Sequence, residues 1–402
     1  MTSLTVESVP LVELDKLQDE RSKTLHALFR QNHRDLALLR EPRLIFHSHM
    51  PHMLGSAYLL GFSEEKLVEM YQSEAAGLKP TNVGFIQNGI TKNNWTEFLH
   101  KKKYTVAYTN FFDERLADLN GDWKALLHEY LFTSPEPLIN GYTGGLGHPF
   151  IHLAYAYEFN SPEIATEALS MGCTEKDKTH VFLDTEQPDT STYKSSSISD
   201  ILVRVQQDER FANLSEFPGF ANIATIFAKA MPAFLEHWNA WDITDPNVQF
   251  EEALDTATKL LMGTSNGNGE YDFYLAHTLT VGHAIRVLLP HFPVEHHISV
   301  LRQFWIFVLY CFIAQLRPSF QTDWLQTVDL KGRDWAWVSA QGAIGPLSND
   351  CHRVKVLRAF KMMEETWGAK EGRYLTAAVK YVDEFSGWTG FGRGVEGLVV
   401  EE

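Results

Sequence analysis

The chain has 402 residues, 44% of them hydrophobic, and a net charge of −16 at pH 7. This length and apolar content can bury a large core, and the negative charge argues against nucleic acid and anionic membrane surfaces as partners. The three cysteines are few, widely spaced and form no CxxC, so no disulfide framework is predicted and a reducing compartment is expected.

The N-terminus has no basic start and no long apolar run, so it is not a signal peptide. The most apolar stretch, Phe304 to Leu316, is flanked by Arg302 and Arg317. It is shorter than the roughly 20 residues of a membrane span and predicts a buried core helix. We therefore expect a soluble, cytoplasmic protein.

Helical periodicity dominates the chain. Ser63 and Ser161 are typical helix caps, and each precedes residues that suit a first helical turn. We expect helices at 15–39, 63–72, 95–101, 112–119, 162–172, 198–207, 220–238, 251–262, 271–289, 294–316, 352–367 and 374–385. The predicted fold is mainly α, a single large multi-helix domain over 1–402, with a two-lobed layout as second choice.

Two segments depart from this pattern. Tyr104 to Tyr108 carries the best strand signal. Residues 184–197 (DTEQPDTSTYKSSS) are polar and of low complexity, which predicts a mobile surface loop or a lid over a pocket.

Histidines gather in four short clusters with spacings that suit a metal ion. Neutral imidazole is a common ligand for Zn, Fe and Cu. The histidines concerned are His47, His49, His52, His148, His152, His277 and His352.

The strongest local motif is His148-Pro149-Phe150-Ile151-His152. Pro149 fits a first helical position, so His148 lies at the cap and His152 one turn in, on the same face. The glycines before His148 permit a close backbone approach. Both histidines are candidate ligands, and the alternative is that one or both are polar core residues.

His49-Met50-Pro51-His52 repeats this arrangement at another helix start. His49 and His52 are candidate ligands, whereas His47 is expected in extended chain and could point away. His277 lies on an apolar helix, where a lone histidine is more often a hydrogen-bonded core residue than a ligand.

His352 opens a helix after Asn349 and Asp350, either of which could cap it, and Lys355 lies on its apolar side. A lysine near a cation loses affinity for its proton, and the neutral amine can react with carbon dioxide to give a carbamate, which ligates like a carboxylate. The alternative is a lysine that extends over the helix surface.

Common nucleotide and hydrolase motifs are missing: there is no P-loop, GxSxG, HExxH or Rossmann fingerprint after a strand. A conventional flavin monooxygenase is therefore not expected, and whether NADPH is consumed stays open.

Four blocks, HSHMPHMLGSAYLLG, GGLGHPFIHLAYAYEFNSP, FYLAHTLT and CHRVKVLRAF, resemble those of the questin oxidase-like family of fungal and bacterial proteins. The resemblance covers about residues 40–385 in the same order. The family includes oxygenases that cleave a ring of polyketide anthraquinones, and relatives assigned Baeyer–Villiger-type steps in mycotoxin pathways.

The resemblance implies a non-haem iron site, Fe(II) with O2 as co-substrate, formed by several histidines and a lysine carbamate. The matching lysine is Lys355, and His352 would lie behind the ligands. One departure is Ser48, where the family pattern more often has Asn, and this bears on the role of His47. The ligand histidines would be drawn from His49, His52, His148, His152 and His277.

The function expected from this resemblance is an iron-dependent oxygenase that inserts oxygen into a hydroxylated aromatic polyketide and opens a ring. The alternatives are a metal-dependent hydrolase and a non-catalytic helical binding protein with structural histidines. The substrate is the expected partner, and a homodimer is kept as a candidate assembly.

Overall fold

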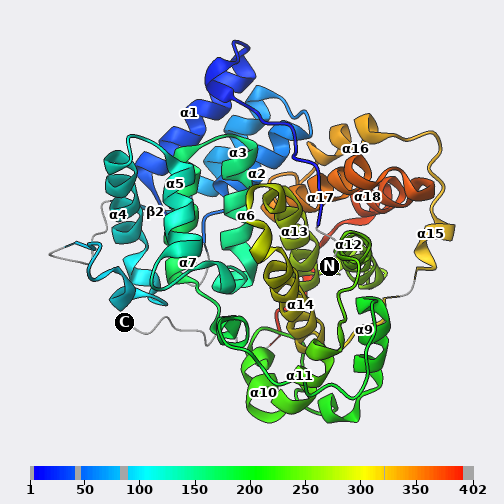
Figure 1. Ribbon diagram of the computed structural model, residues 1–402. Coiled ribbons are helices and arrows are strands. Elements are labelled where there is room, and N and C mark those ends of the chain that lie inside the picture. The colour runs from blue at the N-terminus through cyan, green and yellow to red at the C-terminus, as the bar shows by residue number, and fades with distance from the viewer. Residues whose placement is uncertain (1–3, 41–46, 82–88, 321, 393–402) are drawn as a thin grey trace. The chain divides into compact units, whose positions relative to one another are not determined.

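A computed structural model describes residues 4–40, 47–81, 89–320 and 322–392. These residues form eighteen α-helices and four short strands, so the mainly α prediction is confirmed (Figure 1). The chain divides into two compact units. Among the described residues, unit 1 comprises 4–7, 182–320, 322–347 and 356–392, and unit 2 comprises 8–40, 47–81, 89–181 and 348–355. The single domain over 1–402 stays a prediction.

Unit 2 is built mainly from seven helices and a two-stranded antiparallel sheet. They are α1 Glu20–Asp35, β1 Leu36–Arg40, α2 Met50–Leu59, α3 Glu64–Ala75, β2 Leu78–Pro80, α4 Thr105–Asp118, α5 Trp123–His128, α6 Gly144–Glu158 and α7 Pro162–Thr174. In the sheet, Leu36 lies opposite Pro80 and Arg40 opposite Leu78. Helix α7 packs against α6, α4 and α1, and α2 packs against α3 and α6 (Figure 1).

Unit 1 holds most of the remaining helices. They are α9 Ile198–Gln207, α10 Ala221–Lys229, α11 Met231–Ala240, α12 Pro246–Gly263, α13 Phe273–Leu288, α14 His297–Ala314, α15 Trp324–Thr327, α16 Trp335–Gly342 and α18 Arg373–Glu384. Strands β3 Glu270–Asp272 and β4 Gly387–Thr389 pair in parallel. Two helices cross the unit boundary in sequence, α8 Val181–Asp184 and α17 Cys351–Trp367.

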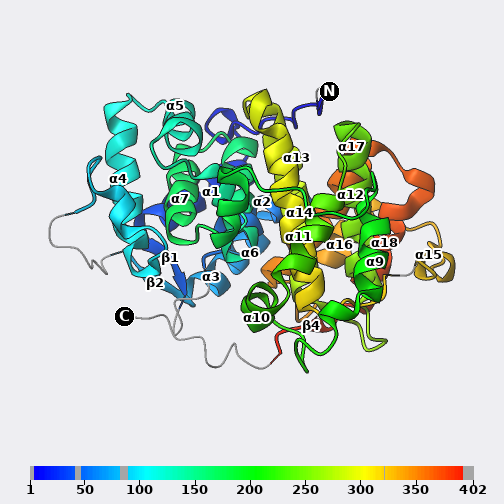
Figure 2. The same ribbon diagram turned by 60° about the horizontal axis from the view of Figure 1, so that its bottom comes forward.

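The core of unit 1 is centred on α14, which packs beside α13 (Figure 2). Residues 294–314 are long and apolar enough to cross a membrane, the one such segment in the described part of the chain, but 83% of the apolar window is buried inside the protein. The prediction of a buried core helix for this stretch is confirmed.

Several helix boundaries follow the predicted caps. The hydroxyls of Ser63 and Ser161 accept hydrogen bonds from the backbone N–H groups of Lys66 and Ile164. Asp350 caps α17, because its Oδ1 accepts the N–H of Arg353 at 2.8 Å.

Four local predictions are wrong. The helix expected at 15–39 ends at Asp35, because the apolar run 36–40 pairs with β2 as a strand. Residues 104–108 lie at the start of α4, where packing in unit 2 overrides their strand propensity. Residues 95–101 form only a short 3-10 helix, Trp95–Phe98. The helix expected at 220–238 is two helices, because Pro232 cannot continue a helix from the preceding turn.

The polar segment 184–197 is irregular, and its second half is hydrogen-bonded within unit 1. Ser195 forms a parallel bridge with Trp241, and the Tyr193 hydroxyl lies 2.6 Å from His237 Nδ1. The Ser197 hydroxyl donates to Glu252 at 2.8 Å. The role of segment 184–197 as a lid stays a prediction.

Candidate metal centre

The start of α2 carries three histidines in the predicted arrangement. His49 is the N-cap of the helix, and Pro51 lies in its first turn. His47 pairs with Leu39 in an isolated bridge, so it lies in extended chain as expected. His52 is fully buried.

The second histidine pair enters α6 through a left-handed turn. Gly145, Leu146 and Gly147 have φ angles of 54°, 58° and 74°, so regular helix begins at His148. A Cβ atom on Gly144 would lie 1.4 Å from the carbonyl oxygen of Glu175. The glycines therefore permit the close backbone approach that the sequence predicts, and they fix where His148 enters the helix.

His49 and His148 face each other through their Nε2 atoms, which are 3.0 Å apart. Nδ1 of His148 lies 2.5 Å from the carbonyl oxygen of Gly145, which can only accept, so this nitrogen carries the proton. Nδ1 of His49 faces the Glu74 carboxylate at 3.4 Å. Both outer nitrogens thus lie near acceptors, and with both protons on Nδ1 the two Nε2 lone pairs face each other across the gap.

A metal ion between the two Nε2 atoms fits this geometry, as does a single hydrogen bond in which a neutral His49 donates its Nε2–H to His148. Two ring nitrogens at right angles about one metal ion, each bonded at about 2.1 Å, are about 3.0 Å apart. The separation of His49 and His148 matches this value. An extra proton on this pair is disfavoured, because burial lowers the pKa of His49 to about 4.

His52 and His152 form the second close pair, with His52 Nε2 and His152 Nδ1 2.9 Å apart. His152 Nε2 lies 2.7 Å from a carboxylate oxygen of Glu167, so this nitrogen carries the proton and Nδ1 offers its lone pair to His52. Nδ1 of His52 is buried and has no hydrogen-bond partner among the described residues. Burial holds the pKa of His52 well below its usual value.

Buried carboxylates lie behind this cluster of histidines. Hydrogen bonding by His49 and the charge on Arg40 outweigh burial and lower the pKa of Glu74 to about 2. Hydrogen bonds from His152 and His33 likewise outweigh burial and lower the pKa of Glu167 to about 2. Glu175 lies 3.1 Å from His47 Nδ1. Ligating histidines usually donate their second N–H to a carboxylate or a backbone carbonyl, so these partners fit a metal centre.

The predicted lysine lies in the same unit. Lys355 is 2% exposed, and its Nζ has no hydrogen-bond partner among the described residues. Burial lowers its pKa to about 8, so a neutral amine is accessible near neutral pH.

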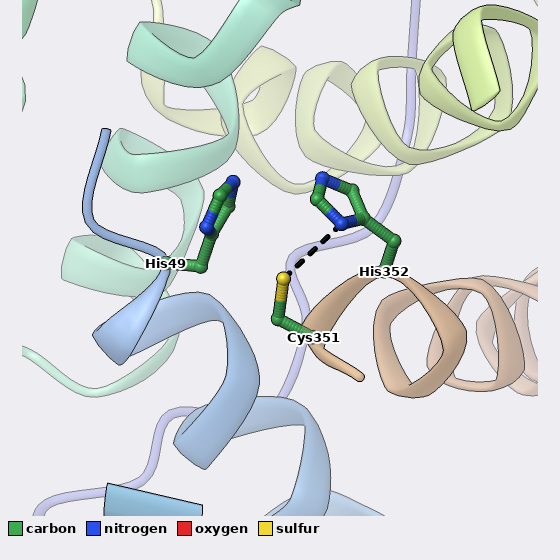
Figure 3. A group of neighbouring side chains, drawn as sticks. All are labelled: His49, Cys351 and His352. Carbon is green, nitrogen blue, oxygen red and sulfur yellow. Dashed lines mark hydrogen bonds between the residues drawn. The ribbon is translucent and has the colours of Figure 1, made fainter. Parts of the chain in front are cut away.

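His352 and Cys351 begin α17 and face the N-cap of α2 (Figure 3). One nitrogen of each of His49 and His352 and the Sγ of Cys351 lie within 4.8 Å of one another. Cys351 Sγ is 3.1 Å from His352 Nδ1. His352 was expected to lie behind the ligands. The structure places its ring beside that of His49.

Ring positions support a common centre for three histidines. Imidazoles that bind one ion through bonds of about 2.1 Å have ring centres about 4.6 Å apart at right angles and about 6.5 Å apart when opposite. The ring centre of His49 is 4.6 Å from that of His352 and 4.9 Å from that of His148. The centres of His148 and His352 are 6.2 Å apart. The centres of His47 and His148, at 4.2 Å, fall below this range.

The structure therefore brings five of the six predicted ligands into unit 2: His49, His52, His148, His152 and Lys355. His277 belongs to unit 1, where it is fully buried on α13 and its Nδ1 lies 2.7 Å from the carbonyl oxygen of Phe273. Its role as a ligand stays a prediction, as does the choice of ligands within unit 2.

Sequence reasoning missed the carboxylates and Cys351. A charged residue within the apolar run of α7, Glu167, was a visible signal, as was the position of Cys351 directly before His352. Glu74 and Glu175 carried no signal, because their partners His49 and His47 lie far away in the sequence.

Comparison with known proteins shows the family to which this chain belongs. The family model described as "Questin oxidase-like" matches residues 46–360, a span that contains all the candidate ligand histidines and Lys355.

Three relatives carry the names of oxidases or oxidoreductases. The Baeyer-Villiger oxidase ptaJ of Pestalotiopsis fici is 25% identical over 79% of this chain and 76% of its own length. The Baeyer-Villiger oxidase GME11358 of Pestalotiopsis microspora is 22% identical over 86% and 82%. The oxidoreductase AflY of Aspergillus parasiticus is 26% identical over 36% and 30%. The names of these relatives indicate an oxidoreductase.

Proposed function

We propose, since this chain belongs to the questin oxidase-like family, that it is an Fe(II)-dependent oxygenase acting on a hydroxylated aromatic polyketide of the anthraquinone type. It would insert oxygen next to a quinone carbonyl, with a Baeyer–Villiger-type outcome, and so open a ring. The Baeyer-Villiger oxidases among its relatives support this class of reaction.

The observation that carries the proposal is the facing pair of His49 and His148. Their outer nitrogens face Glu74 and a backbone carbonyl, so both inner nitrogens can offer lone pairs to one ion. Fe(II), when bound, supplies the redox chemistry that activates dioxygen. Where only some of the candidate residues bind the ion, coordination positions on the ion stay open for dioxygen or substrate.

The residues of the chain hold and isolate this centre. The Glu167 carboxylate fixes the proton of His152 on Nε2, and the Gly145 carbonyl fixes that of His148 on Nδ1. His52 and His152 are 0% exposed, so water is excluded around them. Exclusion of water strengthens every charge interaction in the site.

Lys355 completes the ligand set in this proposal as a carbamate. Its neutral amine would attack carbon dioxide and release one proton, and the new oxygens would bind the ion. Bicarbonate labelled with ¹³C tests this step, since a carbamate at Lys355 gives a new carbonyl signal that Lys355→Ala lacks.

The electron balance of the reaction decides whether a reductant is needed. Insertion of one oxygen atom from O2 leaves the other to be reduced to water, which takes two electrons from a donor such as NADPH. Insertion of both atoms needs no external donor. Oxygen uptake measured with and without NADPH distinguishes these cases.

The test of the function combines metal and oxygen measurements. Iron-loaded protein should consume O2 with a hydroxyanthraquinone, and Lys355→Ala should lose iron and activity whereas Lys361→Ala, on the same helix, keeps both. Product formation without O2 uptake would instead indicate a metal-dependent hydrolase. Folded protein that binds the quinone without turnover would indicate a binding protein.

A further inference from the structure

Cys351 stands among histidines rather than in an apolar core. Its Sγ lies 3.1 Å from His352 Nδ1, and the Sγ and one nitrogen of each of His49 and His352 lie within 4.8 Å of one another, a spacing that could hold a metal ion. Figure 3 shows the sulfur below the two rings, on the side from which α17 enters.

The distance between sulfur and nitrogen suits two ligands of one ion. A metal–sulfur bond of about 2.3 Å and a metal–nitrogen bond of about 2.1 Å at right angles separate the two atoms by about 3.1 Å. The same distance also fits a weak S–H···N hydrogen bond, in which the thiol donates to the ring. Both states are compatible, because the hydrogen bond can hold the metal-free site in place.

We propose that Cys351 is a thiolate ligand of the metal centre, binding a divalent transition-metal ion together with His49 and His352. This inference rests on the metal centre of the proposed function and adds a ligand of a different chemical type to it. The ion would be one that accepts both thiolate and imidazole, such as Fe²⁺, Zn²⁺ or Co²⁺.

Binding would break the S–H bond of Cys351 and form a bond between Sγ and the metal. The proton passes to the solvent buffer, and no electron is transferred, so no oxidant or reductant is required. Burial raises the pKa of Cys351, so without metal the thiol keeps its proton. A coordinated thiol is deprotonated outright.

Cys173 provides a matched control. Cys173 is buried on α7, and burial likewise raises its pKa, but it belongs to no cluster of ligand atoms found among the described residues. Cys173→Ser therefore removes a buried thiol without touching the proposed ligand set.

Cobalt substitution tests the proposal without reference to turnover. Metal-free protein, prepared with a chelator, is titrated with Co²⁺ and followed by absorption spectroscopy. We expect a thiolate-to-cobalt charge-transfer band in the near ultraviolet in wild type and Cys173→Ser. In Cys351→Ser the band should be lost, the visible cobalt bands retained and the affinity for Co²⁺ reduced by about tenfold.

A proton count gives a second readout. Co²⁺ binding to wild type should release one more proton than binding to Cys351→Ser, measured in weakly buffered solution with an indicator dye. Alkylation of Cys351 by iodoacetamide, followed by mass spectrometry, should slow when Co²⁺ is bound.

The outcomes separate this inference from the proposed function. Cobalt that binds through imidazoles with no charge-transfer band, or a band that persists in Cys351→Ser, overturns the thiolate ligand and leaves the histidine centre standing. Folded wild-type protein that binds no Co²⁺ overturns both.

Discussion

The buried carboxylate of Glu167 decides which nitrogen of His152 carries the proton. Glu167 is central, because one of its oxygens lies 2.7 Å from His152 Nε2 and the other 2.9 Å from His33 Nδ1. His33 Nε2 in turn lies 3.1 Å from Asp113, which borders a surface cavity of about 300 Å³. A continuous chain of hydrogen bonds thus runs from a candidate ligand toward the surface.

Replacement of Glu167 should weaken metal binding. In Glu167→Gln the side chain loses its charge and keeps only one acceptor oxygen for the two N–H groups of His152 and His33, so metal affinity should fall about 10- to 100-fold. Titration with Co²⁺ monitored by absorption measures this change. Glu163→Gln, in the first turn of the same helix, is the control and should bind normally, and equal affinity in both variants would refute the role of Glu167.

The stability of the metal-free protein should depend on the charge of His33. Burial disfavours the charged ring, but hydrogen bonds and charges of Asp113 and Glu167 outweigh it and raise the pKa of His33 to about 10. Because the folded pKa exceeds the unfolded value of 6.5, this contribution is fully present below pH 6.5 and is lost as the pH rises toward 10.

The measurement is the free energy of unfolding against pH for wild type and His33→Gln. Wild type should be more stable by about 2 kcal/mol below pH 6.5, and the difference should shrink between pH 6.5 and 10. A difference that stays constant over this range would show that His33 is not charged in the folded protein.

At the scale of elements, the left-handed turn at the start of α6 sets the position of His148. A methyl group on Gly144 would meet the Glu175 carbonyl at 1.4 Å, so Gly144→Ala must displace the turn. We expect a loss of metal binding together with lower thermal stability.

Gly61 provides the control for that substitution. It has a φ of 84°, but a Cβ atom there would meet nothing within 4 Å. Gly61→Ala should therefore cost only about 1 kcal/mol of backbone strain and leave metal binding intact. Calorimetry and metal titration of both variants test this contrast, and normal metal binding by Gly144→Ala would contradict the role of the turn.

Local signals predicted the elements that carry the histidines, because caps and prolines act within one helical turn. Ser161 and the prolines Pro51 and Pro149 correctly marked the helices α7, α2 and α6. Contacts between distant segments were not predictable in this way. The strand 36–40 depends on β2, and the partnership of His152 with Glu167 depends on how α6 packs on α7.

At the scale of the whole molecule, each unit has its own core. In unit 1, Trp305 on α14 is fully buried, and its indole N–H donates to the carbonyl oxygen of Trp238 at 3.2 Å. Trp305→Ala should lower the free energy of unfolding by about 3–5 kcal/mol, because it leaves a cavity in the core helix.

The control for this prediction is Val294→Ala, since Val294 is 63% exposed just before the same helix. It should change stability by no more than about 0.5 kcal/mol. Denaturant titration measures both variants, and a small effect of Trp305→Ala would contradict the assignment of α14 as the core helix of its unit.

The family could be identified from the resemblance of four sequence blocks, and the class of reaction is what that resemblance implies, whereas the substrate could not be identified. Aromatic residues are abundant in both units, and most of them pack against each other as core, as Phe111, Phe112 and Tyr130 do. Their number therefore says little about a flat substrate, and the choice of polyketide rests on relatives rather than on a shaped pocket.

The central claim is that the histidines of unit 2 hold one iron ion. Elemental mass spectrometry of protein purified without chelator, for wild type and His148→Ala, tests it most directly. We predict close to one iron per chain in wild type and a large loss in His148→Ala. Zinc in place of iron would favour a hydrolase, and metal-free, stably folded wild-type protein would contradict the account, since the histidines would then be structural.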